Sequence, residues 1–133
     1  MEESTLKYWK DAGHVARRTL EAMKLELTPG KTFHEVIESA ERYIHRHGGK
    51  PAFPGTIAVN DLAAHFTTDH NVNPVEGWDG EMVLQKGDCV KIDFGVHIKG
   101  HIADNALTFE IGNGNEHTEQ IKAAKEARDA AIE

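Results

Sequence analysis

The stretch KIDFGVHIKGHIADNALTF, residues 91–109, contains the clearest structural pattern in this chain. Apolar residues alternate with small or polar ones through it, which is typical of β-strands that bury one face. Lys99-Gly100 interrupts the alternation and predicts a two-residue turn between antiparallel strands. On this register Gly95 lies opposite Asp104, and Asp93 shares a face with Asp104 as a diagonal neighbour, about 7–8 Å away along the backbone. The other face is apolar and is expected to be buried; it carries Ile92, Phe94, Val96, Ile98, Ala103, Leu107 and Phe109.

The two aspartates are the first candidate functional residues. Two carboxylates that converge over small residues repel each other unless a shared proton or a bound cation neutralises them. Gly95 is expected to leave empty space beside both acids, and two divalent cations about 3.5–4 Å apart suit such a pair. From spacing alone, two solvated acids at a sheet edge are an equally good interpretation. A change of register by one residue would also move one acid to the other face.

Two helices are predicted before the hairpin. Apolar residues recur at helical spacing from Leu6 to Met23, and Ser4 or Thr5 is the candidate N-cap. A second helix is predicted after Thr32, because TFHE has the pattern of a capping box. Gly48-Gly49 is expected to end that helix.

The remaining segments complete an α/β (α+β) pattern. KPAFPGTIAVN, residues 50–60, predicts an extended segment that leads into a short strand from Thr56 to Val59. A long polar loop from Thr68 to Met82 follows, and its acids and His70 are interpreted as solvated. A third helix is expected after residues 112–114. The chain of 133 residues is long enough for one domain.

Composition limits the classes of partner. The chain is 39% hydrophobic and 28% charged, which is typical of a globular domain, and its net charge is −7. An acidic chain is a poor match for nucleic acid or an anionic membrane. The first residues lack the apolar run of a signal peptide, and no stretch is apolar enough to span a membrane. Cys89 is the only cysteine, so no internal disulfide is possible. A cytoplasmic protein is expected.

Two stretches resemble a known family. KIDFGVHIKGHIADNALTF resembles the metal-binding hairpin of methionine aminopeptidases, and PAFPGTIAVNDLAAHFT, residues 51–67, resembles the preceding segment of their type II branch from archaea and eukaryotes. The resemblance implies half of a pita-bread fold, in which helices pack on the outer face of a curved antiparallel sheet. Residues 1–133 are then the N-terminal half of the catalytic domain. The family removes the initiator methionine from nascent proteins with a dinuclear metal site and metal-activated water.

The resemblance also implies roles for four residues. Asp93 matches the aspartate that binds one metal through both oxygens, and Asp104 matches the aspartate that bridges both metals. His65 matches the histidine that contacts the substrate near the scissile amide. Phe53 matches a wall of the methionine pocket. Without the resemblance, His65 and Phe53 are ordinary core residues by default. The implied cofactors are two divalent cations, which could be Co, Mn, Fe or Zn.

Two features depart from the family pattern. The family site uses two Asp, one His and two Glu, and the last three belong to the second half of the fold. The 133-residue chain alone is therefore expected to be inactive, and its sheet to be covered by a C-terminal half or by a second chain. His97 shares the Asp93 face but lies near the turn, so it is a minor candidate for a metal contact. The loop from Thr68 to Met82 is longer than the family pattern suggests.

Two other functions remain open from the sequence. A non-catalytic pita-bread protein could bind RNA, a ribosome or another protein. A related hydrolase could cleave X-Pro bonds. The retained pair of Asp93 and Asp104, together with His65, favours an enzyme over a binder. The stretch AAHFT, residues 63–67, favours the methionine enzyme over the X-Pro enzyme.

Overall fold

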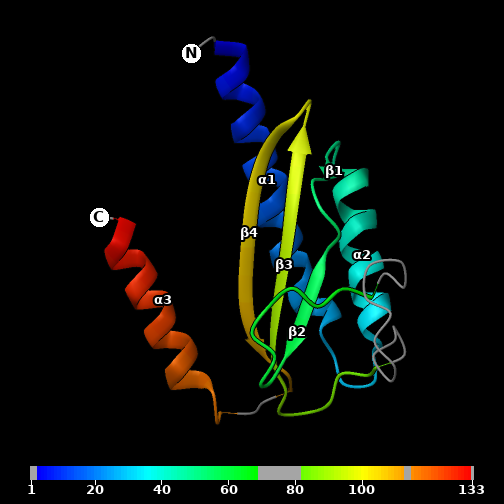
Figure 1. Cartoon of the computed structure of the whole chain (residues 1–133), viewed down its shortest axis with the longest axis vertical. Coiled ribbons are helices and arrows are strands. Elements are labelled where there is room, and N and C mark those ends of the chain that lie inside the picture. The colour runs from blue at the N-terminus through cyan, green and yellow to red at the C-terminus, as the bar shows by residue number, and fades with distance from the viewer. Residues whose placement is uncertain (1–2, 69–81, 113–114, 133) are drawn as a thin grey trace.

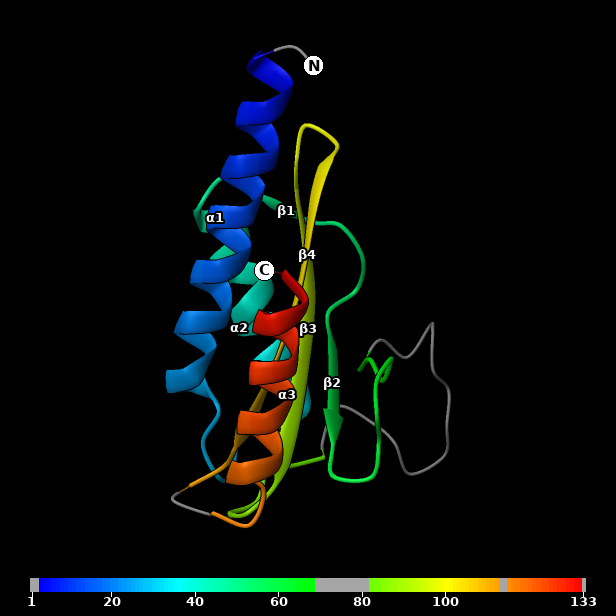
Figure 2. The same ribbon diagram turned by 90° about the vertical axis from the view of Figure 1, so that its left-hand side faces the viewer.

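A computed structural model of the chain describes residues 3–68, 82–112 and 115–132. All described strands belong to one antiparallel sheet, in which β3 pairs with β4 along one edge and with β1 and β2 along the other. Helices α1 and α2 cover one face of the sheet, and residues 60–68 lie on the opposite side (Figures 1 and 2). In chain order the elements are α1 (Glu3–Glu26), α2 (Phe33–Arg46), β1 (Lys50–Pro51), β2 (Thr56–Val59), β3 (Cys89–Ile98), β4 (His101–Glu110) and α3 (Thr118–Ile132).

The hairpin of β3 and β4 has the predicted turn and register. Lys99 and Gly100 both have positive φ, 50° and 83°, which matches a type I′ turn. Gly95 pairs with Asp104, as the alternation predicted. On the predicted apolar face of β3, Ile92, Phe94 and Val96 are at most 2% exposed, whereas Ile98, next to the turn, is only partly buried. On β4 the apolar residues are only partly buried and pack against the edge of the core: Ala103, Leu107 and Phe109.

Helix α1 supplies one side of the core. Its buried residues recur at helical spacing and include Ala12, Ala16 and Met23. The helix begins at Glu3, so the predicted N-cap at Ser4 or Thr5 was wrong. An acidic residue in the first turn is favourable there, because its charge offsets the positive end of the helix dipole. Among the described helices none is both long and apolar enough to cross a bilayer.

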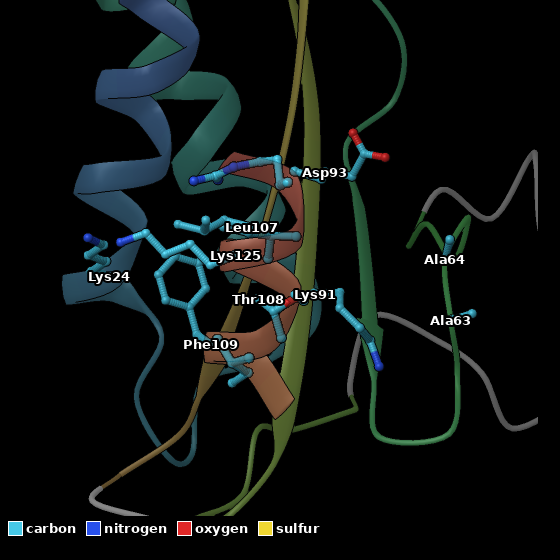
Figure 3. A pocket seen from close by; sticks show the side chains of 14 residues that line it. Lys24, Ala63, Ala64, Lys91, Asp93, Leu107, Thr108, Phe109 and Lys125 are labelled. Atoms are coloured by element: carbon cyan, nitrogen blue, oxygen red, sulfur yellow. The ribbon is translucent and has the colours of Figure 1, made fainter. Parts of the chain in front are cut away.

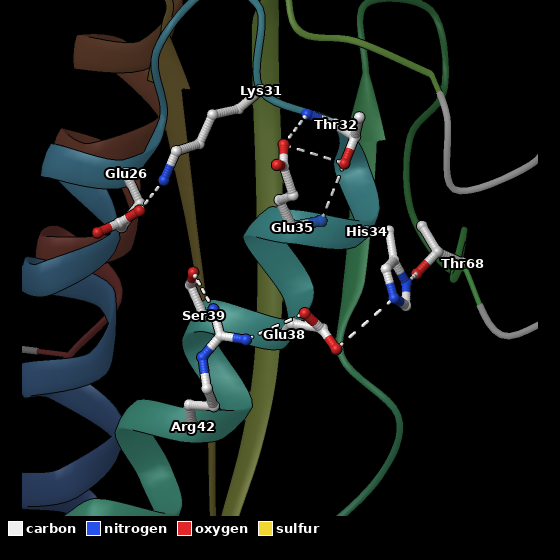
Figure 4. Close-up of polar contacts among 9 residues, drawn as sticks. All are labelled: Glu26, Lys31, Thr32, His34, Glu35, Glu38, Ser39, Arg42 and Thr68. Atoms are coloured by element: carbon white, nitrogen blue, oxygen red, sulfur yellow. Dashed lines mark hydrogen bonds and ion pairs between the residues drawn. The ribbon is translucent and has the colours of Figure 1, made fainter.

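Helix α2 begins at the predicted capping box (Figure 4). The Glu35 backbone N–H donates to Thr32 Oγ1 at 3.1 Å, and the Thr32 backbone N–H donates to the Glu35 carboxylate at 2.8 Å. That backbone hydrogen bond, then the Thr32 hydroxyl, lowers the pKa of Glu35. An ion pair between Lys31 and Glu26 joins the end of α1 to the turn before α2. The turn therefore fixes α2 beside α1 over the sheet.

Helix α3 lies beside β4 (Figure 1). The Glu110 side chain at the end of β4 holds its start, since one carboxylate oxygen accepts from the Glu116 N–H at 2.9 Å and the other from the Thr118 hydroxyl at 3.2 Å. None of the residues of α3 is buried. The third predicted helix is thus confirmed, but it contributes nothing to the core.

Candidate metal and substrate site

The paired aspartates lie on the face of the sheet that α1 and α2 leave open. Asp93 pairs with Ala106, and Gly95 pairs with Asp104, so the two acids are diagonal neighbours on one face. In Figure 3 the Asp93 carboxylate points away from the helices, toward the segment that carries Ala63 and Ala64. The predicted common face of the two aspartates is confirmed.

The pKa of Asp93 responds to burial and to the neighbouring Asp104. Burial raises the pKa of Asp93, and the neighbouring Asp104 side chain raises it further. The nearby His65 lowers the pKa of Asp93. Asp93 Oδ1 is buried and has no hydrogen-bond partner within the described residues. The carboxylate is thus close to a second acid and short of a neutralising partner.

His65 reaches this face from a short segment after β2. The segment leaves the sheet at Asn60. It folds back alongside β2, where the Ile57 N–H donates to the Phe66 carbonyl at 2.8 Å. His65 itself is exposed and has a φ of 66°, which is uncommon for a residue other than glycine. Beyond it, Thr68 Oγ1 lies 3.3 Å from the His34 ring on α2 (Figure 4). The anchored ends hold the imidazole near Asp93.

Phe53 also lies on the open face, directly over Gly95. A Cβ placed on Gly95 would come within 2.2 Å of the Phe53 ring. The expectation of empty space over Gly95 was therefore wrong. The Ala52 N–H donates to the Gly95 carbonyl at 2.8 Å, and this hydrogen bond holds the segment between β1 and β2 against β3. The aromatic ring thus borders the acid pair.

Sequence reasoning missed a polar network at the base of the His65 segment. Asn60 has a φ of 55°, its amide donates to Asp88 at 3.0 Å, and its side-chain oxygen accepts from the Cys89 N–H at 2.9 Å. Lys91, on the same face as Asp93, donates to the Asn60 carbonyl at 2.6 Å. Asn tolerates a left-handed backbone conformation, so the dipeptide Asn60-Asp61 could have indicated a turn at this position.

The other candidates contribute less. His97 is on the acid face as predicted, but its Nδ1 accepts the Gly100 N–H at 3.3 Å in the turn. His70 and most of the loop from Thr68 to Met82 lie outside the described residues. Across ranges 3–68, 82–112 and 115–132, no group of three or more His, Cys, Asp or Glu side chains could hold a metal ion.

A groove of about 460 Å³ runs between β4 and α3 and reaches Asp93 at its edge (Figure 3). Most of its surface is apolar and comes from the partly buried side of β4 and from α3, including Leu107, Phe109 and Ile121. Lys24, Lys125 and Arg128 surround that apolar part. The groove therefore extends from α3 past the edge strand β4 onto the open face, where its lining includes Ala63, Ala64 and Asp93.

The donor set fits a divalent cation in part. Asp93 and Asp104 present carboxylate oxygens on one face, and the unpartnered Asp93 Oδ1 is the kind of atom that a cation would satisfy. Two carboxylates do not close a coordination shell, so further ligands have to come from outside the described residues.

The sheet, the helices on one face and the paired acids on the other define a pita-bread protein of the α/β (α+β) class. Residues 7–133 match Metallopeptidase family M24, and the chain belongs to this family. It is 41% identical over 121 residues to a methionine aminopeptidase of Thermococcus onnurineus, and 38% identical over 133 residues to one of Archaeoglobus fulgidus. These alignments cover 91% and 100% of this chain but 38% and 42% of the relatives.

Solved structures give the same fold. A methionine aminopeptidase from Thermotoga maritima matches with a TM-score of 0.84 and 25% identity, over 99% of this chain and 53% of that one. A prolidase from Pyrococcus horikoshii matches with a TM-score of 0.80 and 28% identity, over 99% of this chain and 36% of that one. The fold is thus common to enzymes of both names, whereas the two curated relatives are methionine aminopeptidases.

Proposed function

We propose that this chain is the N-terminal half of the catalytic domain of a methionine aminopeptidase and supplies part of its metal and substrate site. One observation carries the proposal: Asp93 and Asp104 converge on the open face, and Asp93 Oδ1 is buried there without a hydrogen-bond partner among the described residues. Burial and mutual repulsion make this pair costly unless a bound cation or a shared proton neutralises it. The identity to methionine aminopeptidases over most of the chain points to the same site.

Each residue then has a distinct role. The negative charges of Asp93 and Asp104 hold the cations and keep them on the open face. Two divalent cations, when bound, supply Lewis-acid polarisation of the scissile carbonyl and an acidified water at neutral pH. His65, which is exposed beside Asp93, donates a proton to the scissile amide. Phe53 packs against the methionine side chain of the substrate.

The remaining parts of the site belong to the same proposal. A histidine and two glutamates come from a C-terminal half or a second chain, which also covers the open face of the sheet. The substrate is the N-terminal methionine of nascent polypeptides, and this substrate implies a cytoplasmic location. The 133-residue chain on its own is inactive, because two carboxylates cannot complete the shell.

A non-catalytic binding protein is the alternative. A binding surface has no need for two converging acids, one of which has a buried oxygen without a hydrogen-bond partner among the described residues, since such a pair destabilises the fold. An X-Pro hydrolase shares the fold, as the prolidase match shows. Substrate choice separates these possibilities.

A hybrid enzyme tests the proposal. In it, this chain replaces the segment that it matches in the Thermococcus onnurineus relative, which supplies the rest of the site. We expect the hybrid to release free methionine from Met-Gly peptides with Mn²⁺ or Co²⁺ and to leave X-Pro peptides intact. The double variant D93N/D104N is the inactive control. A folded, metal-loaded hybrid that releases no methionine, or that cleaves X-Pro peptides instead, would contradict the proposal.

A further inference from the structure

The segment that carries Phe53 is fixed to β3 along its length. Lys50 pairs with His97 and Pro51 with Val96 in the sheet. The next residue, Ala52, donates its N–H to the Gly95 carbonyl at 2.8 Å. Consecutive backbone contacts therefore leave the backbone before Phe53 little freedom to shift along the sheet.

Gly49 and Gly55, one on each side of Phe53 in the sequence, let this segment pack closely against the core. A Cβ on Gly49 would meet the Val96 side chain at 2.8 Å, and a Cβ on Gly55 would meet the Phe94 ring at 2.5 Å. Val96 and Phe94 are buried core residues, at 0% and 2% exposure. The backbone before and after Phe53 is thus pressed against the core, and its position follows from that of β3.

Gly95 supplies the third close approach, on the open face. A Cβ on Gly95 would lie 2.2 Å from Phe53 Cε1, 2.5 Å from Cδ1 and 3.0 Å from the Ala52 Cβ. Gly95 is not among the glycines with positive φ, so its backbone is one that alanine also adopts. Space for the Phe53 ring, and not backbone conformation, is what glycine provides at this position.

Gly95 also lies at the centre of the candidate site. It pairs directly with Asp104 and is two residues from Asp93 on the same face. The Phe53 ring that rests on Gly95 therefore stands beside the acid pair. Its height above the sheet sets how much room a substrate side chain has next to the acids.

We propose that Gly95 is a specificity-determining residue: by letting the Cδ1–Cε1 edge of the Phe53 ring approach the sheet closely, it sets the depth of the pocket for the long, unbranched methionine side chain. The inference rests on the proposed function and deepens it. Ordinary van der Waals contact of a Cβ begins at 3.4 Å, so a Cβ 2.2 Å from the ring forces a shift of about 1.2 Å. Because the Cβ stands between sheet and ring, the ring moves into the pocket.

The test is Gly95→Ala in the hybrid enzyme, with peptides that begin with methionine or with the shorter alanine. A ring displaced by about 1 Å costs up to about 10²-fold, and one methylene in a pocket changes selectivity by about 10–200-fold. We expect kcat/KM for methionine to fall at least about tenfold more than for alanine, mainly through KM. Metal content should stay unchanged. The control is Gly13→Ala on α1, where a Cβ meets nothing within 4 Å.

The double variant F53A/G95A separates a steric effect from a general one. If Gly95 acts through the ring, adding G95A to F53A should cost nothing further. If G95A alone fails to fold, recovery of folding in F53A/G95A is the expected result. Selectivity unchanged by G95A, or additive effects of the two substitutions, would overturn the inference.

The ring contact can also be measured in the 133-residue chain without any activity. We expect nuclear Overhauser effects between the Gly95 α-protons and the Phe53 ring. Their absence would overturn the inference even if the hybrid were active. A hybrid that shows the ring contact but releases no methionine would instead contradict the proposed function, and with it the substrate role of Gly95.

Discussion

Asp93→Asn should stabilise the metal-free chain while removing its response to metal. Asn keeps the shape of the side chain but removes a charge that is partly buried beside Asp104. Like charges at neighbouring positions of an exposed sheet face destabilise by roughly 0.2–1 kcal/mol. We expect the free energy of unfolding to rise by about 0.5–1 kcal/mol, which is about 2–4 °C in Tm for a chain of 133 residues.

With metal bound, the wild-type chain should become more stable than D93N. A cation that binds only the folded chain stabilises it by about 2.7 kcal/mol at 100 times its Kd. The wild-type chain should gain stability with added Mn²⁺, whereas D93N has lost one of its two carboxylate ligands and should gain little. Thermal unfolding followed by circular dichroism, with EDTA and with Mn²⁺, measures both effects. Asp61→Asn, at an exposed acid, is the control.

The pH dependence has a defined sign. The pKa of Asp93 is raised in the folded chain, so the folded state holds its proton more tightly than the unfolded state does. Without metal, stability should therefore fall as pH rises from the ordinary value of 3.8 through the raised folded pKa. D93N should lack this fall. A D93N chain that is less stable than wild type at neutral pH without metal, or that gains as much stability from Mn²⁺, would contradict this prediction.

Three further predictions address the fold and the site. Thr32→Ala removes the hydroxyl of the capping box and should lower the free energy of unfolding by about 1 kcal/mol in urea denaturation; an unchanged midpoint would argue against the cap. His65→Ala should lower kcat of the hybrid by about 10²–10⁴-fold, while elemental analysis finds the metal content unchanged; lost metal with normal turnover at saturating metal would make His65 a ligand. The 133-residue chain alone, with Mn²⁺ or Co²⁺, should release no more methionine than its D93N/D104N variant, and any excess would show that the chain has a complete site.

The local elements were predictable where short-range chemistry decides them. Lys99-Gly100 predicts a type I′ turn, and the turn fixes the register that brings Asp93 and Asp104 to one face. The capping box at Thr32 likewise fixes the start of α2. Interactions between residues only a few positions apart can be predicted from the sequence alone.

The contacts across the sheet were not predictable in the same way. The ring of Phe53 covers Gly95, 42 positions later in the sequence, and only the packing of the whole segment from β1 to β2 places it there. The Asn60 network with Asp88 also joins distant positions, 28 residues apart. No spacing rule relates these pairs, because their contacts follow from the tertiary fold. The roles of Asp93 and His65 in metal and substrate binding remain predictions.

Mn²⁺ titrated into the isotope-labelled 133-residue chain tests the metal site most directly. Mn²⁺ is paramagnetic and broadens the amide signals of residues close to it. We predict selective broadening at Asp93, Gly95 and Asp104 on the open face, with sharp signals at Thr32 before α2, and no such broadening in D93N/D104N. Broadening centred elsewhere, or broadening at the open face that persists without both carboxylates, would contradict the account.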